Sequence, residues 1–287
     1  MTQDQQAPLY TRQGYPPGVP CWIDTSQPDP SAARRFYGGL FGWEFEDRMP
    51  PDAPSRYYIG RLDGHDVAAI ASQLQGREDA VWNTYVAVAS ADEAVARARD
   101  AGGRVLMQPF DVQDAGRMAV LADPGGALFC VWQAAAHNGA ELVNAPGTWN
   151  WSDLYTPDVE RAKAFYAAVF GWEAREVDFG GGIAGTMFTL PSYGDALEAL
   201  DPGVRERHAD AGAPEGFTDA VAWLMHDERP ARWSVTFAVE DTDATVSKAY
   251  HLGAEVIVPP YDAGPVRVAG LRDPQGAVFA VSRYAPE

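Results

Sequence analysis

The chain is poor in cysteine and in basic residues. It has only Cys21 and Cys130, too few for a disulfide framework, which is typical of proteins in the reducing cytoplasm. Its 22 Lys and Arg residues face 40 Asp and Glu residues, a formal net charge of −18. Because a surface of that sign repels phosphate backbones, the composition argues against a nucleic-acid partner.

Long apolar runs and a secretion signal are also missing. No apolar run reaches the ~18–20 residues that a membrane-spanning helix requires. The first residues, MTQDQQAPLYTRQGYPPG, lack the basic start and the apolar centre of a signal peptide. We therefore expect a cytoplasmic protein with no membrane partner.

What the sequence does contain is a long internal repeat. The segment at 21–47, CWIDTSQPDPSAARRFYGGLFGWEFED, returns at 150–176 as NWSDLYTPDVERAKAFYAAVFGWEARE. Later segments match as well, 82–103 with 233–254 and 117–131 with 267–281. A repeat of this length is a duplicated domain rather than a solenoid unit, and 287 residues suit about two domains.

The repeat predicts the domain boundaries. We expect a first domain over 15–136, a linker over 137–148 and a second domain over 149–285. The second copy is longer between its two halves, and the extra residues lie within 191–230. We interpret this insertion as a solvated excursion, with a lid over a cavity or a wedge between the domains as the alternatives.

Each copy also contains a shorter internal repeat. Its unit is a strand, a helix and three strands, and it occurs twice in each copy. In the first copy, a strand at 21–25 precedes a helix capped by Asp29, with Pro30 at its first position. Asp63-Gly64 predicts a hairpin turn between two strands. The unit restarts with a strand at 84–88 and a helix capped by Asp92. The pattern predicts an α+β fold with two βαβββ units in each domain.

These features resemble the vicinal oxygen chelate superfamily. The resemblance rests on the paired βαβββ units, the FYxxLFGW end of the first helix and the ADPxGAxF turn before the last strand. That superfamily includes glyoxalase I, extradiol dioxygenases, fosfomycin-resistance enzymes and bleomycin-binding proteins, and the tandem form resembles actinobacterial two-domain glyoxalase-like proteins. The resemblance implies a curled, half-open mixed sheet in each domain. Since the superfamily hosts binding and several chemistries, it leaves the function open.

The resemblance also implies where a metal would sit. Catalytic members hold a divalent ion with His or Gln, His, and Glu on the first, fifth and last strands of a domain. The aligned motifs place these positions at Trp22, Asn83 and Cys130 in the first domain and at Trp151, Ser234 and Ala280 in the second. Indole has no lone pair for a metal, alanine has no donor, and one cysteine alone does not hold a hard cation. None of the five histidines shows a metal-ligand spacing, so we expect no metal and no other cofactor.

Strand alternation places an indole and an acid on the same side of each first strand. If the tryptophans hold the old ligand positions, that side is the concave one, and its mixture of apolar wall and few polar groups suits an organic ligand. We therefore predict ligand-binding roles for a set drawn from both domains. Its members are Trp22, Ser26, Asn83, Cys130, Trp151, Tyr155 and Ser234.

The two strand acids, Asp24 and Asp153, are the candidate catalytic residues. A carboxylate in a cavity acts as a general base or accepts a hydrogen bond from a ligand. The alternative is that each is a buried acid satisfied by backbone N–H groups or arginine. Core packing is likewise the alternative for Trp22 and Trp151.

The leading hypothesis is metal-independent binding, including sequestration, of a small apolar or aromatic organic molecule or natural product. The alternatives are a cofactor-free enzyme (an isomerase, a lyase or a hydroxylase-like catalyst) with a cavity Asp as base, a glyoxalase-type enzyme, and a degenerate scaffold acting through protein contacts. A homodimer is compatible with all of them. Because the segment at 191–230 would shield the second cavity, Trp22 is the favoured indole for stacking on a ligand.

The residues at the implied ligand positions generate the first prediction. Purified protein should contain no stoichiometric zinc, iron, nickel or manganese by elemental analysis. Removing divalent ions with a chelator should change neither the melting temperature nor ligand binding, because no ligand set is there to lose. About one such ion per chain, removed together with stability, would restore the metal-enzyme hypotheses.

Overall fold

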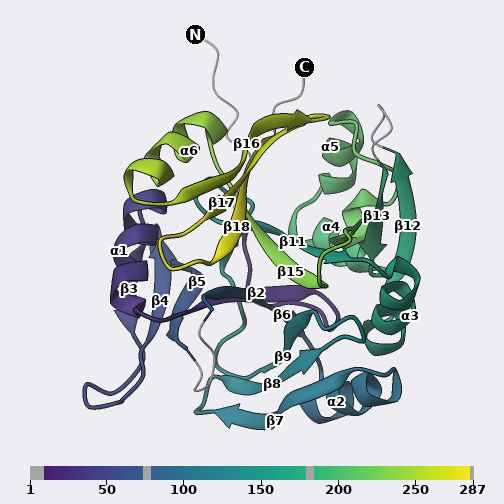
Figure 1. The fold of residues 1–287 in the computed structure, drawn as a ribbon. Coiled ribbons are helices and arrows are strands. Elements are labelled where there is room, and N and C mark those ends of the chain that lie inside the picture. Colours follow the sequence, from purple (N-terminus) through teal and green to yellow (C-terminus); the bar gives the residue numbers. More distant parts are fainter. Residues whose placement is uncertain (1–9, 74–78, 179–183, 285–287) are drawn as a thin grey trace.

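The computed structural model describes residues 10–73, 79–178 and 184–284. It contains two eight-stranded mixed sheets, one from each copy of the repeat, and a two-stranded sheet made of β1 (Tyr10–Thr11) and β10 (Leu142–Val143). Figure 1 shows the first copy at the left and bottom and the second copy at the top and right. The predicted α+β architecture of two tandem domains is confirmed.

The first domain places two βαβββ units side by side in one sheet, in the strand order β3-β4-β5-β2-β6-β9-β8-β7. The two initial strands, β2 and β6, pair antiparallel at the centre, and each pairs in parallel with the last strand of its own unit. The elements are β2 (Pro20–Gln27), α1 (Pro30–Phe41), β3 (Glu44–Asp47), β4 (Tyr57–Leu62), β5 (His65–Ser72), β6 (Val81–Ala87), α2 (Ala91–Asp100), β7 (Arg104–Val112), β8 (Gly116–Ala122) and β9 (Leu128–Ala134).

The second domain repeats this topology in the order β12-β13-β14-β11-β15-β18-β17-β16. Three short helical elements are inserted between β13 and β14, where the first domain has only the turn at Asp63 and Gly64. The elements are β11 (Trp149–Thr156), α3 (Val159–Phe170), β12 (Glu173–Asp178), β13 (Ala184–Thr189), α4 (Tyr193–Leu200), α5 (Val204–Asp210), the 3₁₀ turn η1 (Phe217–Asp219), β14 (Ala220–His226), β15 (Arg232–Ala238), α6 (Thr242–His251), β16 (Glu255–Ala263), β17 (Val266–Arg272) and β18 (Val278–Tyr284).

Local sequence signals explain most of the element boundaries. The Asp29 carboxylate accepts a hydrogen bond from the backbone N–H of Ala32, so it caps α1 as predicted. The Asp63-Gly64 turn has positive φ at both residues, as a two-residue hairpin requires. The predicted cap of α2 is wrong, because Ser90 caps that helix. Asp92 lies in the first turn of α2, where Arg117 pairs with its carboxylate at 2.8 Å.

The apolar cores cross the domain boundary. Phe36 and Phe41 of α1 share one buried cluster with Phe237 of β15 and Phe279 of β18. In the same way, α3 of the second domain packs against α2, β8 and β9 of the first domain. Each FY-containing helix is therefore covered by the second βαβββ unit of the other domain, and Figure 1 shows α1 beside α6 and α3 beside α2.

Hydrogen bonds follow the same crossed pattern. The Tyr37 hydroxyl in α1 donates to Asp273 between β17 and β18 at 2.9 Å, and it accepts from the Trp82 indole N–H at 3.0 Å. Tyr166 in α3 makes the matching bond to Asp123 between β8 and β9 at 3.3 Å. Burial and the Asp273 carboxylate raise the pKa of Tyr37 well above its usual value, so its hydroxyl remains a donor. The FY and DP motifs of the repeat are thus interdomain contacts.

The predicted linker is a packed part of the structure. Within 137–148, Ala140, Leu142 and Val143 are buried in the first core cluster, and β10 pairs with β1. The predicted insertion, 191–230, is longer than the observed one. Most of its last part is β14, which corresponds to β5 of the first domain, so the residues without a counterpart are 190–219. Residue 285, the expected end of the second domain, lies outside the described residues. Among the helices described, none is both long enough and apolar enough to span a bilayer.

The crossed contacts generate the second prediction. Tyr37→Phe should lower the free energy of unfolding by about 1–3 kcal/mol, because it leaves the buried indole N–H of Trp82 without its acceptor and removes a donor from Asp273. Urea denaturation would measure the loss, and Tyr166→Phe should behave alike. Tyr58→Phe is the control, because Tyr58 is buried but its hydroxyl bonds to no other described residue. Equal stabilities of the Tyr37 and Tyr58 variants would contradict the proposed importance of the crossed bonds.

Candidate functional site

Each sheet has one face packed against helices of the interdomain core and one face turned away from them. In β2, Ile23 and Thr25 point toward the core, and Trp22, Asp24 and Ser26 point to the other face. We call that face the Asp24 face. In β11, Leu154 points toward the core, and Trp151, Asp153 and Tyr155 occupy the corresponding face, which we call the Asp153 face.

On the Asp24 face the carboxylate is enclosed and fully hydrogen-bonded. Asp24 is 3% exposed and accepts from Tyr85 at 2.6 Å, Asn83 at 2.8 Å and Tyr57 at 3.3 Å. The Asn83 amide also donates to Ser26 at 3.2 Å. Burial raises the pKa of Asp24, and these donors act against that rise. The network gives both carboxylate oxygens hydrogen-bond partners, and at 3% exposure the acid is closed to a ligand in this structure.

Trp22 is part of the same closed arrangement. Its ring is 3% exposed, its indole N–H donates to the Tyr57 hydroxyl at 3.0 Å, and the His137 ring lies edge-on 4.5 Å from it. Cys130 is also buried, on β9 beside Tyr85. The enclosed ring argues against the sequence-based preference for Trp22 as the ligand-stacking indole, which stays a prediction.

The Asp153 face is more open. Asp153 is half-buried and has a single hydrogen bond, from the Thr236 hydroxyl at 3.2 Å. The carboxylate lies deep among protein atoms yet keeps contact with solvent, and this burial raises its pKa to about 7. Both protonation states are therefore populated near neutral pH. Ser234 is half-buried directly opposite it on β15.

Smaller side chains explain why the second face is open. Strands β6, β8 and β9 of the first domain correspond to β15, β17 and β18 of the second. At matching positions in these strands, the first domain has the larger side chains. The matched pairs are Tyr85 and Thr236, Val120 and Gly270, Cys130 and Ala280, and Trp132 and Ser282. The missing volume lies next to Asp153, because Thr236 hydrogen-bonds it and Ala280 lies opposite Thr236.

One end of the Asp153 face is aromatic. The Trp151 ring is half-buried and lies 5.7 Å from Phe217 and 6.2 Å from Trp223, centre to centre. Phe217 belongs to η1 in the insertion, and the nearby His208 ring bonds the hydroxyl of Thr218 at 3.0 Å. The insertion thus supplies a wall of this face. Its interpretation as a solvated excursion is wrong for η1.

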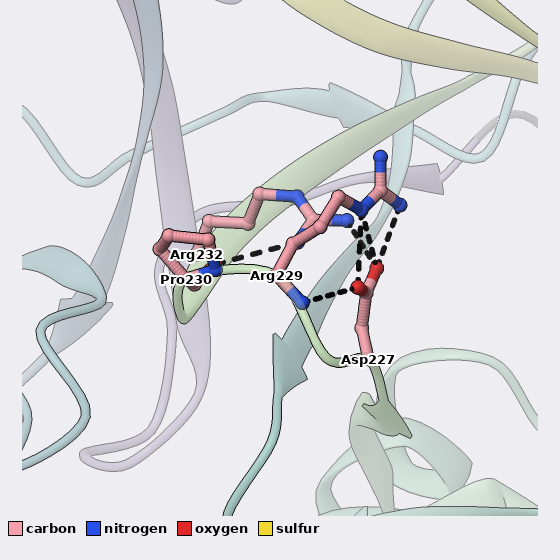
Figure 2. Close-up of polar contacts among 4 residues, drawn as sticks. All are labelled: Asp227, Arg229, Pro230 and Arg232. Carbon is pink, nitrogen blue, oxygen red and sulfur yellow. Dashed lines mark hydrogen bonds and ion pairs between the residues drawn. The ribbon is translucent and has the colours of Figure 1, made fainter.

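The other end of the face is cationic. The Arg232 guanidinium lies 4.7 Å from the centre of the Tyr155 ring and donates to Asp227 at 2.6 Å. Figure 2 shows Arg229 bound to the same carboxylate. The distance from its Nη2 to Asp227 Oδ2 is 2.6 Å. Hydrogen bonds from Arg229 and then from Arg232 hold the pKa of Asp227 well below its usual range. Burial raises the pKa of Tyr155, so its hydroxyl stays protonated.

The positions implied for a metal do not form a ligand set. The second domain has Trp151 on β11, Ser234 on β15 and Ala280 on β18, and only the serine has an oxygen donor. In the first domain, the Asn83 amide is engaged by Asp24 and Ser26. Within 10–73, 79–178 and 184–284, no three His, Cys, Asp or Glu side chains lie close enough together to hold an ion. The fold's divalent metal therefore does not fit these residues.

Two shallow hollows lie away from both acids. One of about 210 Å³ is lined by charged residues around Arg117 on β8, and one of about 300 Å³ lies beside Lys163 on α3. The second is lined by Glu160, Glu176 and His226, and neither includes an aromatic wall. Their charged, open linings suit an apolar ligand less well than the Asp153 face does.

Sequence reasoning missed several residues of these faces. Tyr85 and Thr236 lie two positions after Asn83 and Ser234, so strand alternation alone would have placed them on the same faces. Tyr57 and Phe217 had no comparable signal. Their places depend on the register of β4 and on the path of the insertion.

The raised pKa of Asp153 generates the third prediction. A carboxyl that binds its proton more tightly in the fold favours folding below its unfolded pKa of about 4 and loses that contribution as the pH rises through about 7. Asp153→Asn removes this titration. The wild type loses this contribution between about pH 4 and pH 8, and the variant does not. The free energy of unfolding of Asp153→Asn, minus that of the wild type, should therefore rise by on the order of 2 kcal/mol over this range, a value reduced for solvent contact.

Urea denaturation at several pH values would measure this difference. Asp52→Asn, which changes an exposed loop aspartate, is the matched control and should leave the pH dependence of the wild type unchanged. A pH dependence in Asp153→Asn that parallels the wild type would show that Asp153 has an ordinary pKa.

Comparisons with known proteins cover most of the chain. Residues 138–281 match the family described as Glyoxalase/Bleomycin resistance protein/Dioxygenase superfamily, and residues 22–132 match the Glyoxalase-like domain. The chain is 39% identical over 285 residues to "Putative glyoxylase CFP32" of Mycobacterium bovis, covering 96% of this chain and 98% of that one. It is 37% identical over 281 residues to "Anthracycline biosynthesis protein DnrV" of Streptomyces peucetius, covering 93% and 94%.

Solved structures share the fold at low identity. The Mn(II)-bound glyoxalase from Novosphingobium aromaticivorans aligns with a TM-score of 0.58 and 15% identity, over 98% of this chain and 84% of that one. A variant of homoprotocatechuate 2,3-dioxygenase from B. fuscum aligns with a TM-score of 0.59 and 13% identity, over 95% and 73%. The resemblance predicted from the repeat is confirmed, and this chain belongs to the glyoxalase/bleomycin resistance protein/dioxygenase superfamily, the vicinal oxygen chelate proteins.

Proposed function

We propose that the protein binds a small, largely apolar or aromatic organic molecule on the Asp153 face of its second domain, without a metal ion. One observation carries this proposal: Asp153 is a half-buried carboxyl with a single hydrogen bond, placed between a half-exposed indole and a small-residue floor. A polar group with spare hydrogen-bonding capacity in apolar surroundings is what an oriented organic ligand requires. Its counterpart Asp24 already has three donors and is 3% exposed, so it is enclosed rather than open to a ligand.

The aromatic end of the face supports a flat ligand. Trp151 offers part of its ring surface beside Phe217 and Trp223, and stacked aromatic pairs add about 0.5–1.5 kcal/mol beyond the apolar area they bury. The relative named as an anthracycline biosynthesis protein points the same way, because anthracyclines contain a fused-ring anthraquinone. We extend that ligand class to this chain as fused-ring aromatic molecules.

A cofactor-free enzyme is the second candidate, and the pKa of Asp153 favours it. A general base works best with a pKa near the working pH, and burial places that of Asp153 at about 7. Proton abstraction by this carboxylate, with Thr236 holding its second oxygen, is the chemistry the site would perform. No nucleophile paired with a base adjoins it among the described residues, so binding without turnover remains the leading proposal.

The fourth prediction tests the location of the site with anthraquinone-2-carboxamide, a neutral fused-ring probe. Isothermal titration should show binding to the wild type. Trp151→Phe should weaken it by roughly 3–10-fold, because a smaller ring gives a smaller stacking surface. Trp22→Phe is the matched control and should stay within about twofold, since Trp22 is 3% exposed. Quenching of tryptophan emission should shrink only in the Trp151 variant.

Three other results would change the proposal. Weaker binding in the Trp22 variant alone would move the site to the first domain. Equal responses of both variants would place it on neither face. Conversion of the probe that is lost in Asp153→Asn would establish the enzyme instead.

A further inference from the structure

The cationic end of the Asp153 face lies next to Tyr155, the last of the three β11 side chains on that face. Arg232 lies directly opposite Tyr155 in the register of β11 and β15, so both side chains belong to the same face. The guanidinium is held over the Tyr155 ring at 4.7 Å, with about a third of its side chain exposed. Its position is therefore fixed, while part of it still reaches solvent.

Two guanidinium groups share one carboxylate at this end. Arg229 donates to Asp227 through Nε and Nη2, and Arg232 donates through Nη2 (Figure 2). In Figure 2 the third nitrogen of Arg229 points away from Asp227. The adjoining Glu228 lies 3.5 Å from His226, whose side chain lines the hollow beside α3 on the core side of the sheet. The arginines thus leave one positive charge uncompensated by Asp227.

A structural role accounts for only part of this arrangement. Asp227 fixes the β14–β15 loop, and one arginine would be enough for that purpose. The second one, Arg229, has a side chain that is 73% exposed and contributes little stability there. Within 227–232 two acids balance two arginines in number, but both guanidinium groups share the single carboxylate of Asp227 beside the ligand face. Their remaining donors suit an anionic partner.

We propose that Arg229 and Arg232 bind an oxyanion of the ligand, a carboxylate or phenolate at one end of an elongated aromatic molecule whose rings lie on Trp151. This inference rests on the proposed function and specifies its ligand class. Trp151 and Tyr155 are four residues apart on β11, a span of about 13 Å, which matches the length of a fused-ring aromatic acid. Guanidinium groups with donors left over from Asp227 recognise such an oxyanion by charge-assisted hydrogen bonds.

The test compares two probes of the same shape, anthraquinone-2-carboxylate and anthraquinone-2-carboxamide, by isothermal titration at neutral pH. The wild type should bind the carboxylate at least about tenfold more tightly than the amide. Arg232→Gln and Arg229→Gln should each remove most of that advantage and leave the amide within about twofold. Arg283→Gln, on the other face of β18, is the matched control and should change neither affinity. Added salt should weaken the carboxylate only.

The outcomes separate this inference from the proposed function. Equal binding of both probes by the wild type would overturn the oxyanion site and leave the aromatic site standing. Equal weakening of both probes by Arg232→Gln and none by Arg229→Gln would also overturn it, because Arg232 would then act only by packing on Tyr155. Binding of neither probe would overturn the proposed function together with the oxyanion site.

Discussion

The crossed contacts between the two domains hold the two sheets together in one structure. Tyr37 reaches Asp273, and Tyr166 reaches Asp123, so each domain provides the buried donor for a turn of the other. The surrounding aromatic clusters are shared in the same way. The fold therefore does not consist of two independent cores joined by a linker. The segment between the domains is itself buried, through Leu142 and Val143.

This packing leaves the two outward faces of the sheets free to diverge. The crossed bonds of Tyr37 and Tyr166 involve no side chain of either face, so side-chain volume on the faces can change without loss of those bonds. In the first domain, aromatic and polar side chains fill the face, and three of them donate hydrogen bonds to Asp24. The second domain keeps small residues beside Asp153 and leaves that carboxyl with one partner. Duplication has thus produced one closed, structural face and one face with the features of a binding site.

The repeat in the sequence was sufficient to predict the architecture. Matching FYxxxFGW and DPxGA motifs predicted two domains of paired βαβββ units, and strand alternation predicted which side chains share a face with Asp24 and Asp153. The helix cap at Ser90 was missed because Asp92 is an equally good capping residue by type, and only the backbone geometry distinguishes the two.

The difference between the two faces was beyond the reach of the repeat. Trp22 and Trp151 occupy equivalent positions, and nothing in a single strand shows that Tyr57 and His137 cover only the first of them. Those contacts join strands and loops distant in sequence, so they depend on sheet register and on the path of the segment after β9. The place of Arg232 on the Asp153 face could not be predicted for the same reason, because it depends on the pairing of Arg232 with Tyr155. Long-range packing, rather than local pattern, decides which copy is open.

We propose a ligand site in the second domain and not in the first. A crystal structure of the protein with anthraquinone-2-carboxylate bound would locate the probe. We expect density for the probe along β11, with its rings on Trp151 and its carboxylate toward Arg232, and none on the Asp24 face. Density enclosed against Trp22 and Tyr85 in the first domain, with the Asp153 face empty, would contradict this proposal.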